Sequence, residues 1–365
     1  MGGVPQGPEE LTSAWCSAAF GSPVEVVEVS TFGEGVGMLS VMARVVLAWP
    51  ERDAESARPG VATDRPSSVV VKLPPWRARN HGMGTDWGYF LREAEVYRHF
   101  GPGLPAPRCH HVAVDPDARL AALVLDDLTA SRPLDQVVGA SLADAEAVVD
   151  TMASLHARWW EHPALERCGF VPALDDGVED RSARLYRESF PGFAERFRDH
   201  VPSGAFRAAE RYGPQLATLY HRWAGGGPNT LSHNDLRLDN MLMPAEGAPV
   251  FVDWQRVIRY RGASDLAYFV AGSLPVEDRR RHEDRLVVRY HDRLLEAGVQ
   301  GYGPAALRED YRRSMLRWLG LVSTAAQLDV ANARGERLIE VMVERHFTAA
   351  DDHDVAALLD DGPIP

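Results

Sequence analysis

The sequence predicts an α+β fold with a small, β-rich N-terminal lobe and a larger, mostly helical C-terminal lobe. Short β-branched runs separated by turn residues occupy the first third of the 365 residues, which is typical of strands. From Leu142 onward apolar residues recur at helical spacing, and only the polar segment 231–256 interrupts them. We place the N-terminal lobe at residues 1–125 and the C-terminal lobe at residues 126–365.

The N-terminal lobe is expected to open with a helix near Glu9–Ala19 and a glycine-rich hairpin. Glycines let a hairpin backbone close over phosphates, although most such hairpins are plain turns. The apolar run Val41–Trp49 follows as a strand, and the charged, Pro- and Gly-rich segment 50–67 as a flexible connection. The glycines predicted to cover a nucleotide are Gly33, Gly35 and Gly37.

A lysine stands at the end of the next β-branched run, Ser68–Leu73. Lys72 occupies the place of a strand lysine that holds the α- and β-phosphates of a nucleotide. A lysine at a strand end is more often simply solvated, so an acid on a following helix is needed to orient it. The segment 89–100 has apolar residues at helical spacing and offers two acids, Glu93 and Glu95.

The strongest functional signal is the polar segment that begins Leu-Ser-His-Asn-Asp at residue 231. Asp235 and Asn240 are five residues apart, and Asp253 follows thirteen residues later, after a short apolar run. A phosphoryl-transfer site needs one carboxylate near the attacking hydroxyl and two oxygen-bearing side chains for magnesium. These three residues fit those roles, with Asn240 and Asp253 as the Mg²⁺ ligands. The alternative is a polar turn whose side chains bond only nearby backbone.

These motifs resemble those of the aminoglycoside phosphotransferase and choline-kinase-like superfamily, especially its ecdysteroid-kinase-like branch and related actinobacterial phosphotransferases. The family loop usually reads His-Gly-Asp and then Asn. Here Asn234 takes the glycine position, and Asn is one of the few residues that tolerate left-handed backbone geometry. The resemblance covers most of the chain and implies a bilobal, protein-kinase-like fold.

The resemblance also assigns residues around the nucleotide. It selects Glu93 as the partner of Lys72, because the family pattern is Glu-x-x-x-Tyr and Glu93 lies four residues before Tyr97. The strands near 109–114 and 120–125 lead into a hinge whose backbone bonds the adenine edge. The hinge residues are Leu125, Asp126, Asp127 and Leu128.

Three residues near the loop have competing interpretations. Arg237 could face the transferred phosphate, where a fixed guanidinium favours the transition state, or form a salt bridge with Asp239. His233 could be a metal ligand or a general base beside Asp235, but in the resembling families this histidine braces the loop by hydrogen bonding, which is the interpretation we adopt. Asp265 resembles the acid that opens the next helix and ties down the loop, and helix capping is a sufficient explanation for it.

Composition limits the partners. The formal charge of −13 argues against general nucleic-acid binding, which needs clustered Lys and Arg, and is compatible with a cationic substrate. No apolar stretch approaches the roughly 20 residues that span a bilayer, so we expect no membrane partner and a cytoplasmic location. Three scattered cysteines fit a reducing compartment. The oligomeric state is not predicted.

The sequence therefore favours a Mg²⁺-dependent phosphotransferase that uses ATP or GTP and phosphorylates a hydroxyl group of a small molecule, such as an aminoglycoside-like antibiotic or another natural product. Asp235 would orient or deprotonate the hydroxyl. One alternative is a kinase for Ser or Thr residues of a peptide, although no D-F-G motif with an activation segment ending in Ala-Pro-Glu is found. The other is a pseudokinase that binds nucleotide without transferring phosphate.

Overall fold

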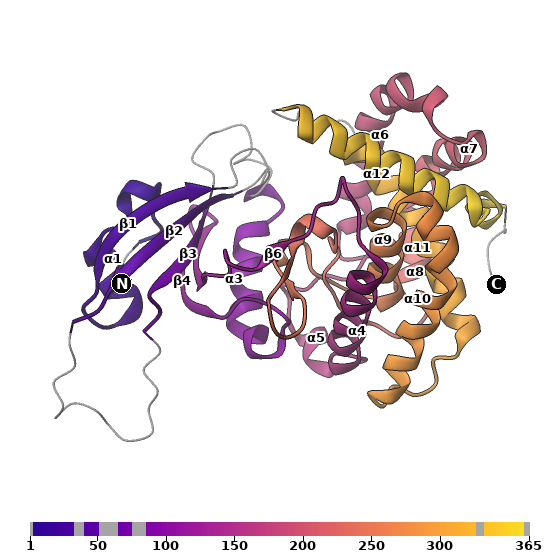
Figure 1. The fold of residues 1–365 in the computed structure, drawn as a ribbon. Coiled ribbons are helices and arrows are strands. Elements are labelled where there is room, and N and C mark those ends of the chain that lie inside the picture. Colours follow the sequence, from indigo (N-terminus) through magenta and orange to yellow (C-terminus); the bar gives the residue numbers. More distant parts are fainter. Residues whose placement is uncertain (1–2, 33–39, 51–64, 75–84, 326–331, 361–365) are drawn as a thin grey trace. The chain divides into compact units, whose positions relative to one another are not determined.

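The computed structural model describes residues 3–32, 40–50, 65–74, 85–325 and 332–360. The chain divides into two compact units, residues 1–131 and residues 132–365, which are described separately below (Figure 1). Gly33, Gly35 and Gly37 and most of the predicted connection 50–67 lie outside the described residues. The fold class predicted from the sequence, a small antiparallel sheet region and a larger helical part, is confirmed.

The first unit contains a five-stranded antiparallel sheet with strand order β1-β2-β3-β5-β4. β3 is the central strand, and its pairing places Lys72 opposite Met42 on one side and Leu123 on the other. The strands are β1 (Glu25–Phe32), β2 (Val41–Ala48), β3 (Ser68–Leu73), β4 (Cys109–Asp115) and β5 (Leu120–Asp126).

Two α-helices of the first unit are described, α1 (Ser13–Phe20) and α3 (Tyr89–Phe100), together with 3₁₀ turns η1 (Pro8–Glu10) and η3 (Gly101–Gly103). α1 begins later than the sequence predicts, because Thr12 accepts a bond from the Trp15 N–H at 3.2 Å and so caps it. α3 contacts β4 and β5, and its buried face includes Glu93 and Tyr97.

The second unit has two small sheets that hold the polar segment. β7 (Thr230–Ser232) pairs with β10 (Ile258–Tyr260), and β6 (Arg132–Pro133), β8 (Met241–Met243) and β9 (Val250–Phe251) form the other sheet. Single 3₁₀ turns, η6 (Leu238–Asn240) and η7 (Trp254–Arg256), lie between the strands. The polar segment therefore alternates short strands and turns, which agrees with the apolar runs that flank it in the sequence.

The other regular elements described in the second unit are helices. The helices are α4 (Leu142–Arg158), α5 (Pro163–Arg167), α6 (Val178–Phe197), α7 (Ser203–Tyr212), α8 (Leu216–Ala224), α9 (Gly262–Ser273), α10 (Val276–Glu296), α11 (Pro304–Ala325) and α12 (Ala333–Asp352). Further 3₁₀ turns are η4 (Arg198–His200), η5 (Gly213–Gln215) and η8 (Val355–Leu359). None of the helices in the described ranges is both long and apolar enough to cross a bilayer.

α9 forms the centre of the helical unit. All of its residues are buried, and it contacts α4, α10, α11 and α12 (Figure 1). It also contacts β7, the strand that leads into the polar loop. A helix that is packed on several sides can hold side chains against that loop with little freedom to move. Asp265 and Tyr268 are held in this way.

Candidate active site

Lys72 in the first unit is held by Glu93. Its Nζ lies 2.6 Å from Glu93 Oε2, and the two side chains are only 10% and 4% exposed. Glu95, the competing acid, instead pairs with Arg98 on the exposed side of α3. The pair is buried, so removing either partner would weaken the compensation of the other's charge in a poorly solvated site. Lys72 is also the only lysine in the sequence, against 38 arginines. It is therefore the only side chain of this protein that carries an ammonium group.

The residues predicted to form the hinge already have internal partners. The Asp126 N–H donates to the Arg108 carbonyl oxygen at 2.9 Å, and the Leu128 carbonyl oxygen accepts from the Ser131 N–H at 2.9 Å. Leu125 lies inside β5, opposite Val70 and Cys109. A carbonyl oxygen has two lone pairs, so the Leu128 oxygen retains capacity for a further donor.

The Asp127 side chain bonds residues of two strands, β2 and β3. Its carboxylate accepts bonds from Arg44 Nε and Ser68 Oγ, both at 2.6 Å, and from the Thr129 N–H at 3.0 Å. Burial alone would raise the pKa of Asp127, but the bonds from Ser68, Thr129 and Arg44 outweigh it and hold the pKa well below its usual range. Asp127 thereby anchors the segment after β5 to β2 and to the start of β3, the strand of Lys72.

In the second unit Asp265 holds the start of the polar loop. This fully buried carboxylate accepts bonds from the backbone N–H groups of His233 and Asn234 at 2.7 and 2.9 Å and from Ser232 Oγ at 2.9 Å. His156 Nε2 lies 3.2 Å away. Burial opposes the charge, yet these partners lower the pKa of Asp265 from 3.8.

The prediction that Asp265 ties down the loop is confirmed, but its explanation by helix capping is wrong. The N-cap of α9 is Arg261, and no side chain caps this helix. Asp265 lies inside the first helical turn, and its oxygens bond the loop after β7 rather than the N–H groups of its own helix. Because α9 contacts β7, the Asp265 carboxylate lies close enough to the loop after β7 to accept its backbone N–H groups.

Asn234 has the left-handed backbone conformation expected at the glycine position of the motif, with φ of 62°. Its side chain adds bonds that a glycine could not make. Nδ2 donates to the Arg256 carbonyl oxygen at 3.0 Å, and Oδ1 accepts from the Arg317 guanidinium at 2.7 Å. The substitution therefore preserves the turn and ties it to η7 and α11.

Asp235 follows this turn and is mostly buried, with 8% of its surface exposed. Its Oδ1 accepts a hydrogen bond from the Tyr268 hydroxyl at 3.2 Å. Tyr268 is itself stacked on Trp318, with ring centroids 4.0 Å apart, and on His346. Burial, followed by the nearby Asp235 charge, raises the pKa of Tyr268, so the phenol stays protonated as a donor at neutral pH.

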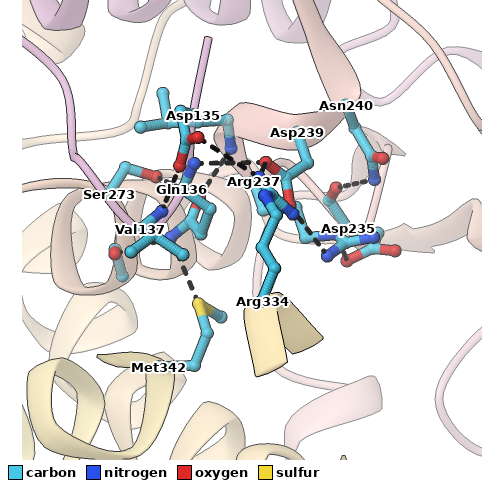
Figure 2. Close-up of polar contacts among 12 residues, drawn as sticks. Asp135, Gln136, Val137, Asp235, Arg237, Asp239, Asn240, Ser273, Arg334 and Met342 are labelled. Atoms are coloured by element: carbon cyan, nitrogen blue, oxygen red, sulfur yellow. Dashed lines mark hydrogen bonds and ion pairs between the residues drawn. The ribbon is translucent and has the colours of Figure 1, made fainter. Parts of the chain in front are cut away.

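Asn240 and Asp253 are brought toward each other by the β8–β9 hairpin. In this hairpin Met241 lies opposite Phe251, and the Val252 N–H donates to the Asn240 carbonyl oxygen at 3.0 Å. The Asn240 side-chain amide donates to the Asp235 carbonyl oxygen at 2.9 Å (Figure 2). With its nitrogen engaged, Asn240 presents an oxygen as its remaining polar atom.

Asp253 occupies the left-handed region at φ 69°, a conformation that costs energy outside glycine and is concentrated at functional sites. Its Oδ2 accepts from Gln255 Nε2 at 3.0 Å. One amide oxygen and one carboxylate form the kind of all-oxygen donor set that Mg²⁺ takes, with its remaining positions left for water and phosphate. The residues present therefore fit the metal that the sequence predicts.

Arg237 and His233 complete the loop. Arg237 Nη1 lies 3.4 Å from Asp239 Oδ2, and its Nε lies 4.0 Å from Asp235 Oδ1. The predicted salt bridge with Asp239 is thus present, and the role of Arg237 toward the transferred phosphate stays a prediction. Burial lowers its pKa, but Asp235, Tyr268 and Asp239 together raise the net pKa. His233 Nε2 lies 3.0 Å from the Val252 carbonyl oxygen, which confirms that this histidine braces the loop.

Sequence reasoning missed several residues that contact the loop, among them Tyr268, Arg317 and Gln136. Tyr268 had a local signal, since it follows Asp265 by three residues and so lies on the same face of α9. Arg317 is a buried arginine in an amphipathic helix, which is unusual without a partner. The Gln136 side chain accepts from the Leu238 N–H at 2.7 Å, and nothing in its surrounding sequence signals this contact.

Comparisons with known proteins agree with this architecture. A model of the ecdysteroid kinase-like family matches residues 34–299. Solved structures with a similar fold include a choline kinase from Cryptosporidium parvum Iowa II (13% identity, TM-score 0.53, covering 98% of this chain and 97% of that one). A choline kinase from Streptococcus pneumoniae is also similar (13% identity, TM-score 0.50, 95% and 98% covered). No curated protein sequence gave a significant match.

Proposed function

Since the chain belongs to the ecdysteroid kinase-like family, whose members are small-molecule kinases, we propose that it is a Mg²⁺-dependent enzyme that moves the γ-phosphate of ATP or GTP onto a hydroxyl group of a small molecule. The observation that carries the proposal is the bond from the Asn240 amide to the Asp235 carbonyl oxygen at 2.9 Å. It ties the Asn240 side chain to the backbone of Asp235, which supports a loop that carries both an acceptor-orienting carboxylate and an oxygen ligand for the metal.

In this proposal Asp235 orients the acceptor hydroxyl and receives its proton. The Tyr268 hydroxyl holds Oδ1 of that carboxylate at 3.2 Å, which limits its rotation. Arg237, buried beside Asp235, stabilises the negative charge that spreads over the transferred phosphoryl oxygens. Positioning and electrostatics supply most of the rate enhancement in such reactions.

Asn240 and Asp253 would hold Mg²⁺ through their side-chain oxygens. The positive charge that Mg²⁺ supplies there would offset the negative charge of the nucleotide phosphates. In the first unit Lys72, oriented by Glu93, holds the α- and β-phosphates. The predicted roles of the hinge residues 125–128 and of Gly33, Gly35 and Gly37 around the nucleotide remain part of the proposal.

The acceptor is proposed to be a hydroxylated natural product or antibiotic of the aminoglycoside type. The charge of −13 is compatible with a cationic substrate. Amino alcohols deserve a place among the candidates, because the fold is shared with choline kinases and with a Plasmodium vivax ethanolamine kinase (13% identity, TM-score 0.50, 88% of this chain and 84% of that one covered).

A peptide substrate is less well supported. α9 begins at Gly262, nine residues after Asp253, and η7 and β10 occupy the interval. This leaves little chain for an activation segment of the kind that positions peptide substrates in protein kinases. The small-molecule acceptor is therefore the main proposal.

We expect acceptor-dependent release of ADP or GDP when the protein is mixed with Mg²⁺, nucleotide and a panel of aminoglycosides, other hydroxylated natural products, amino alcohols and Ser/Thr peptides. Removal of Mg²⁺ with EDTA should abolish the release, because Asn240 and Asp253 need the metal to hold phosphate. Mass spectrometry of the acceptor measures the added phosphate. Phosphorylation of peptides alone would contradict the small-molecule proposal, and nucleotide binding without transfer to any acceptor would favour a pseudokinase.

Because Lys72 is the only lysine, nucleotide binding can be followed at one side chain. We expect Mg²⁺ and ATP at ten times the Kd to slow modification of Lys72 by an amine-reactive reagent by roughly tenfold, the ratio that simple occupancy gives. The terminal amine is the internal control and should react at an unchanged rate. Peptide mass spectrometry separates the two amines, and equal rates at Lys72 with and without nucleotide would remove Lys72 from the proposed site.

A further inference from the structure

One buried carboxylate beside the loop is shared by two arginines from distant parts of the second unit. Asp239 Oδ2 lies 3.4 Å from Arg237 Nη1, and Asp239 Oδ1 accepts a bond from Arg334 Nη2 at 3.0 Å. The Gln136 N–H also donates to Oδ1, at 3.1 Å. Figure 2 shows Asp239 between the two guanidinium groups, with Asp235 beyond Arg237.

Because Asp239 is buried, we expect the loss of one of these contacts to cost more free energy than the loss of a surface ion pair. Its side chain is 4% exposed, whereas that of Arg334 is 38% exposed. A buried carboxylate needs full compensation by charge and hydrogen bonds. Arg334 supplies part of that compensation at Oδ1, so Arg237 does not have to supply all of it at Oδ2.

Arg237 lies between two competing carboxylates. Its Nη1 contacts Asp239 at 3.4 Å and its Nε is 4.0 Å from Asp235. If Asp239 lost the Arg334 guanidinium, only Arg237 and the Gln136 N–H would compensate its charge, so it would attract Arg237 more strongly and draw it away from Asp235. The position of Arg237 would therefore depend on Arg334, which is ion-paired with Asp239 at 3.0 Å and with Asp135 at 3.4 Å.

We propose that Arg334 is a positioning residue for the catalytic loop: by sharing Asp239 with Arg237, it keeps the Arg237 guanidinium directed toward Asp235. This inference rests on the proposed function, in which Arg237 acts on the transferred phosphate. Arg334 lies in the first turn of α12, outside the residues 34–299 matched by the family model, and so links the loop to a helix beyond the matched part.

The attachment of α12 near the loop is supported at a second point. Arg345 donates to the carbonyl oxygens of Gln136 and Gly272 at 2.7 and 3.0 Å. The Gln136 side chain in turn accepts from the Leu238 N–H and donates to the Gly272 carbonyl oxygen. The first turn of α12 is also fixed, because the Asn332 side chain accepts from the Gly335 N–H at 2.9 Å. Arg334 thus approaches Asp239 from an anchored helix.

The test compares Arg334→Met with Arg337→Met. Arg337 lies on the same helix but pairs with Glu340 at the surface, where both side chains are about half exposed. We expect Arg334→Met to lower kcat by between about tenfold and a hundredfold, the range expected when a catalytic group is misplaced, with the KM for nucleotide unchanged. Arg337→Met should leave both constants unchanged, and Arg334→Lys should restore part of kcat.

A double substitution separates positioning from a general loss of structure. In an Asp239→Asn background the carboxylate that attracts Arg237 is absent, so Arg334→Met should have little further effect on kcat. An equal fold-loss in both backgrounds would overturn the inference, as would an unchanged kcat in the single variant. The cycle measures the coupling of these two residues directly.

A second measurement needs no turnover and so separates this inference from the proposed function. In NMR spectra of ¹⁵N-labelled arginine side chains, the Nε–H signal of Arg237 is identified by its loss in Arg237→Lys. Arg334→Met should shift this signal, and Arg337→Met should not. An unshifted signal overturns the inference even in an active enzyme, whereas a shifted signal in a protein that phosphorylates nothing upholds the contact and counts against the proposed function alone.

Discussion

Asp235→Asn is expected to lower kcat for phosphate transfer by about 10²- to 10⁴-fold, the contribution typical of a positioned general base. The substitution keeps a side-chain oxygen that can accept from the Tyr268 hydroxyl, now 3.2 Å from Asp235 Oδ1, so the loop should retain its shape. It removes the negative charge and the capacity to take a proton from the acceptor. Steady-state rates with the best acceptor of the panel measure the effect.

Nucleotide binding should survive this substitution, because the proposed phosphate and metal contacts belong to Lys72, Asn240 and Asp253. Protection of Lys72 from modification by Mg²⁺ and ATP is the measurement, and it should match that of the unsubstituted protein. Glu246→Gln is a suitable control, since Glu246 is an exposed acid in the connection between β8 and β9. If Asp235→Asn kept its full kcat, the assignment of the base would be wrong.

Parts of the site that depend on short motifs could be predicted from the sequence and its family resemblance. The family pattern Glu-x-x-x-Tyr selects Glu93 over Glu95, and Glu93 and Tyr97 both lie on the buried face of α3. The left-handed turn at Asn234 follows from its place at the glycine position of the family motif and from the tolerance of Asn for that conformation. The strands on either side of the loop follow from short apolar runs with turn residues between them.

Contacts between distant segments could not be predicted in this way. Arg334 and Asp239 are joined only because α12 lies near the loop in the folded unit, and an arginine in the first turn of an amphipathic helix is ordinarily a solvated residue. The contact of Gln136 with the Leu238 N–H likewise joins segments that are distant in the sequence. The interpretation of Asp265 as a cap failed for the same reason, since the sequence shows only an acid near the start of a helix, whereas its oxygens bond residues 232–234.

Asp265→Ala is expected to lower the free energy of unfolding by about 3–5 kcal/mol, as when one partner of a buried charged network is removed. The His233 and Asn234 N–H groups, which now donate to this carboxylate at 2.7 and 2.9 Å, would lose their acceptor in a buried site. Equilibrium denaturation with urea measures the change. Transfer activity should fall as well, because the turn that places Asp235 depends on those two bonds.

Asp278→Ala is the matched control, because Asp278 also lies in the first turn of a helix, α10, but forms an exposed pair with Arg281. Its loss should cost no more than about 1 kcal/mol. The pH dependence adds a second criterion. Since the pKa of Asp265 is lowered from 3.8 in the folded protein, its stabilisation is fully present above pH 3.8 and is lost as the pH falls through the lowered value. The stability difference between the original protein and Asp265→Ala should therefore shrink in acid, and a difference that stayed constant would mean that the charge of Asp265 contributes nothing to holding the loop.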